Sequence, residues 1–128
     1  MTLWWLHSDG LLGLIELWAV LMIGHALADF SLQTEFMARA KNRHVPHGYP
    51  DLPTRTLWVY CLTAHALVHA GAVWLITGNA AFGLAEFILH WLIDWMRIEG
   101  KRVNFHLDQA LHIACKVIYV LIVAALNR

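Results

Sequence analysis

The sequence predicts an all-α protein in which four transmembrane helices pack as an antiparallel bundle. Composition is the first reason, because 59% of the 128 residues are hydrophobic, only 14% are charged, and the mean hydropathy is +0.54. The second reason is four apolar segments, each near the roughly 20 residues that a helix needs to cross a bilayer. A chain of this length forms one domain. We therefore expect residues 1–128 to form a single four-helix membrane domain, with helices at about 11–36, 56–77, 80–98 and 105–126.

Each segment is bounded by residues that favour a helix or end one. The first begins with Leu11–Gly24, in which Glu16 is the single charged residue, so it has no polar face for a soluble bundle to expose. All three prolines fall in the connection 42–55 and interrupt no helix. Gly78-Asn79 predicts a tight turn between the second and third helices, and Gly100 a break before the fourth.

The distribution of basic residues predicts the orientation of the bundle. Seven of them lie in or beside the first and third connections: Arg39, Lys41, Arg43, Arg55, Arg97, Lys101 and Arg102. The opposite side of the membrane holds only Arg128. Since cytoplasmic loops carry the excess of Lys and Arg, we expect these two connections in the cytoplasm and both termini outside.

Ionisable residues recur at every fourth position within all four segments. They are His25 and Asp29, then His65 and His69, then Glu86, His90 and Asp94, and finally Asp108, His112 and Lys116. A spacing of four places each set on one face of its helix. Ionisable groups at membrane depth cost on the order of 2.5–3.5 kcal/mol each, so they normally face the bundle interior and serve a function.

Counting helix rise from the cytoplasmic ends, at about 1.5 Å per residue, sorts these residues by depth. A first layer, roughly 10 to 14 Å deep, holds Asp29, His65, His90 and His112. A deeper layer, at roughly 16 to 20 Å, holds His25, His69, Glu86 and Lys116. Gln33, Asp94 and Asp108 lie nearer the cytoplasmic mouth. The matching depths predict that the four faces meet in one site toward the cytoplasmic face.

The residue types at these positions favour a divalent metal. Imidazole and carboxylate ligands suit zinc first, and also iron or manganese. Four carboxylates against Lys116 leave an interior charge near −3 with neutral histidines, which one or two divalent ions would offset. The candidate ligands are His25, Asp29, His65, His69, Glu86, His90 and His112. The alternative is a metal-free network in which histidines and carboxylates pair with one another, as in proton relays.

Several motifs together resemble one known family. They are His25-Ala-Leu-Ala-Asp29-Phe-Ser-Leu-Gln33 followed by Met37 and Lys41, then His65-x₃-His69, Glu86-x₃-His90-x₃-Asp94 and Asp108-Gln109-x₂-His112. The chain resembles a family of small bacterial and phage membrane proteins known as domain of unknown function 3307. That resemblance implies a helical protein of the bacterial inner membrane and carries no established activity. A looser likeness, in ligand style alone, links it to membrane-bound metal-dependent hydrolases.

Two classes of function remain open at this point. The first is a metal-dependent hydrolase acting on a lipid or lipid-linked phosphoester at the cytoplasmic leaflet, with Asp94 or Asp108 as general base. The second is a non-enzymatic protein, either a metal or proton conduit or a metal-stabilised protein that binds a partner. Membrane lipid is the expected partner in the first class, and a second copy of the chain is a further candidate. Equal numbers of acidic and basic residues give no reason to expect nucleic acid.

Glu86 and Lys116 are also predicted to pair, because they share the deeper layer on neighbouring helices. A buried ammonium needs a partner, and Glu86 is the carboxylate at matching depth. The competing interpretation makes Glu86 a metal ligand and leaves Lys116 to face water.

Overall fold

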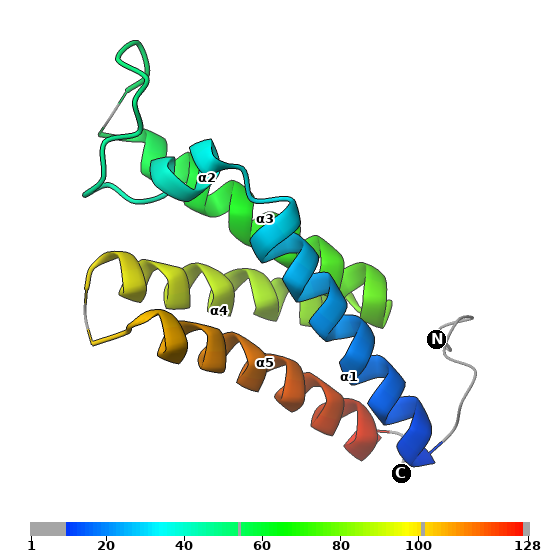
Figure 1. The fold of residues 1–128 in the computed structure, drawn as a ribbon. Helices are drawn as coiled ribbons and strands as arrows, with labels where there is room; N and C mark the ends of the chain where they lie inside the picture. Colours follow the sequence, from blue (N-terminus) through cyan, green and yellow to red (C-terminus); the bar gives the residue numbers. More distant parts are fainter. Residues whose placement is uncertain (1–9, 54, 101, 127–128) are drawn as a thin grey trace.

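The computed structural model describes residues 10–53, 55–100 and 102–126 and confirms the all-α class (Figure 1). Its elements are α1 (Gly10–Ala26), a π-helical turn η1 (Leu27–Ser31), α2 (Glu35–Ala40), α3 (Leu57–Thr77), α4 (Ala80–Ile98) and α5 (Phe105–Leu126). The described residues contain no strand.

The first predicted helix, 11–36, is wrong in its second half. The α-helix ends at Ala26 and continues as one wider turn, in which the Leu32 N–H donates to the Leu27 carbonyl at 2.8 Å. Residues 32–34 are not helical, and Thr34 then caps α2 by accepting a hydrogen bond from the Met37 N–H at 3.2 Å. Hydropathy alone runs through this break, whereas Thr34 as a capping residue was a local signal for it.

The other three helices match their predicted bounds to within one residue. Gly78 ends α3 in the left-handed region at φ 65°, which glycine adopts without steric cost. The Asn79 side chain accepts a hydrogen bond from the Ala81 N–H at 2.9 Å and starts α4. The Gly78-Asn79 turn is therefore confirmed, and it joins α3 and α4 into a tight helical hairpin.

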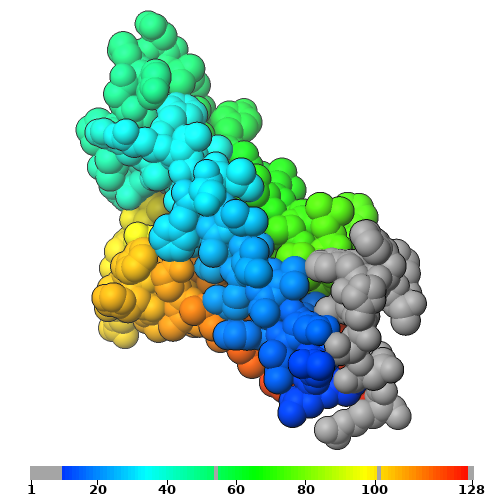
Figure 2. Space-filling view, turned by 45° about the vertical axis from the view of Figure 1, so that its right-hand side comes forward, coloured from blue at the N-terminus to red at the C-terminus, as the bar shows by residue number. Residues whose placement is uncertain are grey.

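The four long helices contact one another in a closed order, α1 with α3, α3 with α4, α4 with α5, and α5 with α1. Figure 1 shows α2, the start of α3, the end of α4 and the start of α5 at one end of the molecule, which we call the α2 end. Figure 2 shows α1 lying between α3 and α5 on one face. At the α3–α4 contact, a Cβ atom on Gly83 would lie 2.8 Å from the Cβ of Trp74, so only glycine permits this approach.

The interior contains polar residues beside apolar ones, and much of the surface is apolar. Among the described residues, ten polar or charged residues are buried, while large apolar side chains face outward, among them Leu75 at 78% and Leu11 at 74% exposure. In the same part of the chain, three helices are long and apolar enough to cross a membrane: Gly10–Ser31, Leu57–Thr77 and Phe105–Leu126. Together these features suggest membrane association.

Two basic residues used to predict orientation, Lys101 and Arg128, lie outside the described residues, as do both chain termini.

Candidate metal centre

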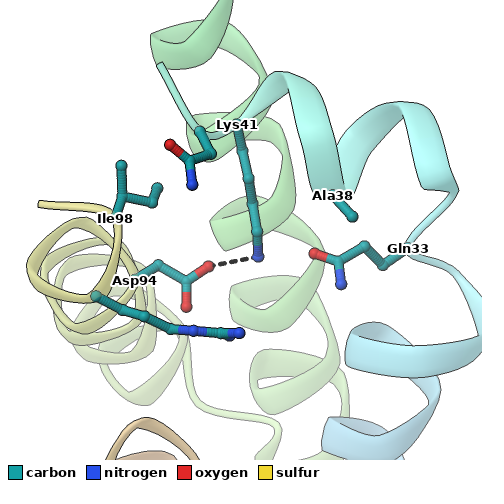
Figure 3. Close-up of a pocket in the computed structure, with 7 residues that line it drawn as sticks. Gln33, Ala38, Lys41, Asp94 and Ile98 are labelled. Atoms are coloured by element: carbon teal, nitrogen blue, oxygen red, sulfur yellow. Dashed lines mark hydrogen bonds and ion pairs between the residues drawn. The ribbon is translucent and has the colours of Figure 1, made fainter. Parts of the chain in front are cut away.

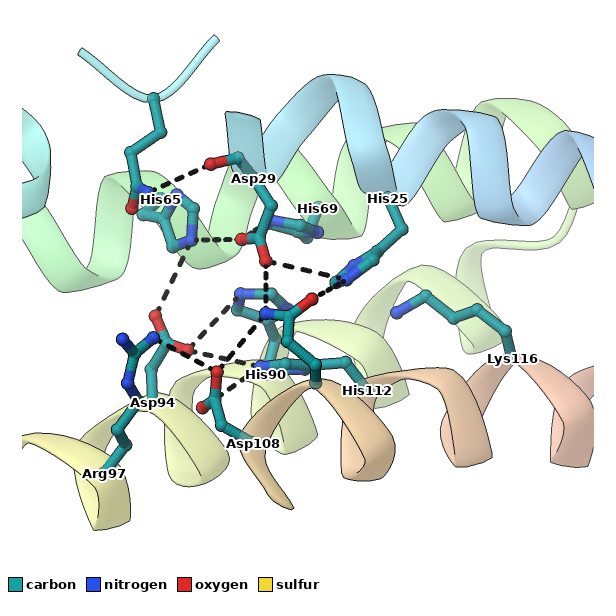
Figure 4. A network of polar contacts seen from close by, with 12 residues as sticks. His25, Asp29, His65, His69, His90, Asp94, Arg97, Asp108, His112 and Lys116 are labelled. Carbon is teal, nitrogen blue, oxygen red and sulfur yellow. Dashed lines mark hydrogen bonds and ion pairs between the residues drawn. The ribbon is translucent and has the colours of Figure 1, made fainter. Parts of the chain in front are cut away.

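Four ligand-type side chains converge between η1, α3 and α4. Asp29, His65, His69 and His90 each offer one oxygen or nitrogen atom, and these atoms lie within 4.8 Å of one another. The Asp29 Oδ1 atom is 3.3 Å from the Nε2 of His65 and 3.2 Å from the Nε2 of His69. Figure 4 shows these residues directed toward one another from η1, α3 and α4. We call them the Asp29 group.

The Asp29 group fits a metal because the Nε2 atoms of its three histidine rings form no aligned hydrogen bond. The Nε2 atoms of His65, His69 and His90 are buried, yet none is aligned for a hydrogen bond with a described residue. Buried polar atoms are nearly always satisfied, so three orphans in one place need an explanation. Ligand atoms 2.0–2.1 Å from a tetrahedral zinc ion lie about 3.3 Å apart. The separations of 3.2 and 3.3 Å between the Asp29 oxygen and the histidine nitrogens, without hydrogen-bond alignment, therefore match those of ligands around one metal ion.

A second group shares His90 with the first. His90, Asp94 and His112 also bring their ligand atoms within 4.8 Å of one another. The Asp94 Oδ1 atom is 3.2 Å from the His112 Nε2 and 3.8 Å from the His90 Nε2. Its Oδ2 atom lies 3.6 Å from the Nε2 of His65, so Asp94 adjoins both groups.

The rings of the two groups form one stack across the predicted layers. His69 stacks on His90 with ring centroids 3.6 Å apart, and His90 on His112 at 4.1 Å. His69 was assigned to the deeper layer and the other two to the first. In the structure, both layers therefore belong to a single polar network.

The π-helical turn and two glutamines hold Asp29. The Gln33 Nε2 donates to the Asp29 carbonyl at 3.0 Å, which satisfies a backbone acceptor where the helix ends. The Gln109 Nε2 donates to the Asp29 Oδ2 atom at 2.8 Å and leaves Oδ1 facing the histidines. π-Helical turns such as η1 occur often at functional sites. Sequence reasoning assigned no role to Gln109, although it adjoins Asp108 in a recognised motif.

His25 and Asp108 border the groups without joining either. The Nε2 of His25 is 3.5 Å from the Asp29 Oδ2 atom and 3.4 Å from the Gln109 side-chain oxygen. Asp108 accepts a hydrogen bond from the Arg97 Nη1 at 3.2 Å, and its other oxygen lies 3.7 Å from the His112 Nε2.

Glu86 lies behind His90, and its predicted pairing with Lys116 is confirmed. The Lys116 ammonium donates to Glu86 Oε1, which is also 3.3 Å from the Nδ1 of His90. The Tyr119 hydroxyl donates to the other oxygen at 3.0 Å. Glu86 is a member of neither ligand group. It therefore engages one nitrogen of His90 and leaves the Nε2 directed at the Asp29 group, the arrangement in which a carboxylate orients a metal-binding histidine.

Two cations among the basic residues used to predict orientation, Lys41 and Arg97, reach into the site. The Lys41 Nζ donates to the Asp94 Oδ2 atom at 2.7 Å, and Lys41 is only 9% exposed. Arg97 bonds Asp108, as described above. Lys41 lies just after α2, whereas Arg97, in the last turn of α4, reaches across the connection 99–104 to Asp108 in α5. The interior charge is therefore −1 with neutral histidines, from four carboxylates against Lys41, Arg97 and Lys116, rather than −3.

A further ion pair ties the first connection to α4 at the α2 end. The Arg43 Nη2 donates to the Glu99 Oε2 atom at 2.7 Å, and the guanidinium lies 5.3 Å from the centroid of the Trp58 ring. Desolvation raises the pKa of Glu99, but Arg43 and the nearby His44 outweigh it and hold the pKa below its ordinary value. This carboxylate is therefore charged at neutral pH.

Comparison with known proteins identifies a family. Residues 17–128 match the family model described as "Protein of unknown function (DUF3307)". The searches of curated proteins and of solved structures find no match. The matched region holds the whole network, from His25 to Lys116. As its motifs predict, the chain belongs to the DUF3307 family.

Proposed function

We propose that this protein is an integral membrane protein that holds one divalent cation in the Asp29 group. In this proposal α1 with η1, α3, α4 and α5 cross the bilayer as a four-helix antiparallel bundle, with the α2 end in the cytoplasm. Three of these helices already have the length and apolarity of membrane spans. The fourth, α4, is of similar length, and its Glu86 and Asp94 are 1% and 3% exposed, so its charges face the interior.

The observation that carries the proposal is the set of three unpartnered Nε2 atoms facing Asp29. Charge balance supports one cation rather than two, because Lys41 and Arg97 already offset two of the four carboxylates. Three imidazoles and one carboxylate suit zinc, with iron and manganese as the nearest competitors.

Metal analysis of the full chain tests this proposal. Protein purified in detergent without chelators should carry about one divalent ion per chain, and His69→Ala and Asp29→Ala should lose most of it. His106→Ala is the matched control, because His106 is an exposed histidine at the start of α5. Wild-type protein that neither retains a divalent ion nor takes one up after reconstitution would overturn the proposal.

The activity that best fits such a centre is hydrolysis of a lipid or lipid-linked phosphoester at the cytoplasmic leaflet. A divalent cation there would supply activation of water and offset charge on a phosphoryl or carbonyl oxygen. Asp94 adjoins both ligand groups and Asp108 contacts His112, so either carboxylate is placed to accept a proton. The candidate metal centre lies close to the α2 end, which in this proposal is the end at the level of the cytoplasmic lipid headgroups.

Hydrolysis is tested with the protein reconstituted into vesicles of bacterial lipid extract. We expect wild-type protein with zinc to release phosphate or a headgroup, and His90→Ala to release none. His106→Ala should behave as wild type. Lipid left unchanged by metal-loaded wild-type protein would refute the hydrolase assignment and leave the metal assignment standing.

A proton or metal conduit is the second candidate, and the stack of His69, His90 and His112 is the observation that favours it. Against it, Leu17, Leu21 and Phe82 belong to a buried apolar cluster in the same bundle. Vesicles containing the protein should show no proton or zinc flux above the His90→Ala variant. A flux that requires His90 would favour the conduit.

A further inference from the structure

A cavity of about 170 Å³ opens beside the candidate metal centre at the α2 end (Figure 3). It is lined by Gln33, Ala38, Lys41, Asn42, Asp94, Arg97 and Ile98. A water molecule occupies about 30 Å³ of liquid, so the cavity has room for a small polar group. Asp94 belongs both to this lining and to the second ligand group, so the cavity and the candidate metal centre share a wall.

The cavity lining holds more free donors than acceptors. Lys41 has three N–H bonds and uses one on Asp94, and Arg97 has five and uses one on Asp108. Asn42 accepts a hydrogen bond with its side-chain oxygen from the His44 N–H, which leaves its amide N–H groups available. A ligand that fills the cavity must therefore present several acceptors.

One unpartnered acceptor adds a second requirement. The Gln33 Oε1 atom is buried without a hydrogen bond among the described residues, while its Nε2 is committed to the Asp29 carbonyl. A buried carbonyl oxygen in this state calls for a donor from outside the described residues. Figure 3 shows Gln33 and Lys41 directed toward the same space beside Asp94.

We propose that this cavity binds the phosphoryl group of a phosphomonoester, with Lys41, Arg97 and Asn42 donating to its oxygens and Gln33 accepting from a hydroxyl. Lysine and arginine are the usual phosphate-binding side chains. Lys41 also turns toward Asp94, so the phosphoryl group would lie next to the shared wall. This inference deepens the proposed function, because it names the substrate class that the centre would meet.

Calorimetric titration of the full chain in detergent tests the cavity, with inorganic phosphate and glycerol 3-phosphate as probes. Wild-type protein should bind at least one of them with Kd below about 10 mM, and Lys41→Gln and Arg97→Gln should each weaken binding about tenfold. Asn42→Ala, which keeps both charges, should weaken it about threefold. Arg55→Gln is the matched control, because it removes one exposed positive charge from the same end and should change Kd less than about twofold.

Competition identifies the source of the phosphoryl group. Phosphatidic acid in nanodiscs that displaces the soluble probe, where phosphatidylcholine does not, would identify a lipid headgroup. Soluble phosphoesters that bind without such competition would identify a soluble phosphomonoester. Both results support the proposal. Wild-type protein that binds no probe, or Lys41→Gln and Arg97→Gln that bind as wild type does, would overturn it.

Metal content is measured on the same samples, which separates the two proposals. Protein that retains its ion but binds no phosphate or phosphatidic acid refutes the cavity alone. Protein that binds phosphate through Lys41 and Arg97 but holds no ion refutes the metal centre alone. Where Lys41→Gln does not fold, Asn42→Ala and Arg97→Lys give the result, since Arg97→Lys keeps the charge but loses the paired donors and should still weaken binding.

Discussion

The contacts of His90 fix the orientation of its ring, because its two ring nitrogens face different groups. Its Nδ1 lies 3.3 Å from Glu86, while its Nε2 remains unpartnered at the place where both ligand groups meet. The stacked His69 and His112 rings on either side restrict its rotation. The orientation of this one ring therefore depends on Glu86, which in turn depends on the charge of Lys116.

The Glu86–Lys116 pair should be structural, and paired substitutions can show it. Lys116→Met leaves a buried carboxylate without its cation and should lower the free energy of unfolding by about 3 kcal/mol. Adding Glu86→Gln should recover part of that loss. Unfolding of each variant in detergent measures both effects. Tyr119→Phe removes only a neutral donor and should cost about 1 kcal/mol.

Metal content of the double variant decides between the two roles of Glu86. If Glu86 only orients His90, the double variant keeps a bound ion with weakened affinity. A double variant that recovers no stability and binds no ion would instead make Glu86 a ligand.

Spacing on one helix was enough to predict most residues of the network, but not those that enter it from elsewhere. Asp29, His65 and His90 follow a four-residue period, so each could be assigned to an inward face. Lys41 lies just after the end of α2, and its position depends on how the chain leaves η1. No periodicity describes that departure. The missing cations also explain why the sequence analysis overestimated the interior charge.

At the scale of the element, η1 determines where Asp29 points. A π-helical turn takes more residues per turn than an α-helix and changes the direction of the side chains within it. The sequence predicted the three long helices after η1 almost to the residue, because Gly78, Asn79 and Gly100 provide local end signals. Residues 25–34, where α1 passes into η1 and the chain then leaves the helix, contain no glycine or proline, and hydrogen bonds from Gln33 and Gln109 support the altered geometry.

The α3–α4 hairpin depends on a close approach at Gly83. Gly83→Val should destabilise the protein by about 1–3 kcal/mol, because its side chain would collide with the Trp74 Cβ atom and the Ala70 carbonyl oxygen. Gly71→Ala is the control, since a Cβ there meets no atom within 4 Å. Thermal unfolding in detergent compares the two. Equal thermal unfolding midpoints for Gly83→Val and wild type would show that moving α3 away from α4 costs no stability, which would contradict this prediction.

The described part of the molecule buries ten polar or charged residues and exposes many large apolar side chains, which suggests membrane association. Its orientation there should follow the basic residues, of which Arg39, Arg43, Arg55 and Arg102 are exposed at the α2 end. A periplasm-active phosphatase fused after Arg128 should therefore be active. The same enzyme inserted between Gly48 and Tyr49, in the connection at the α2 end, should be inactive. The reverse pattern would invert the proposed topology.

The Gly78-Asn79 turn also has a consequence for how the chain is made. In the proposed topology α4 must enter the membrane during synthesis, yet its acidic residues Glu86 and Asp94 oppose insertion, because a charged side chain at mid-membrane depth costs about 2.5–3.5 kcal/mol. The strongly apolar α3 emerges from the ribosome just before it and is joined to it by two residues. We expect α3 and α4 to insert through the translocon as one unit, so that α4 enters the lipid already paired with α3. The Glu86 carboxylate of α4 then gains its ion-pair partner only when α5, which carries Lys116, has been synthesised.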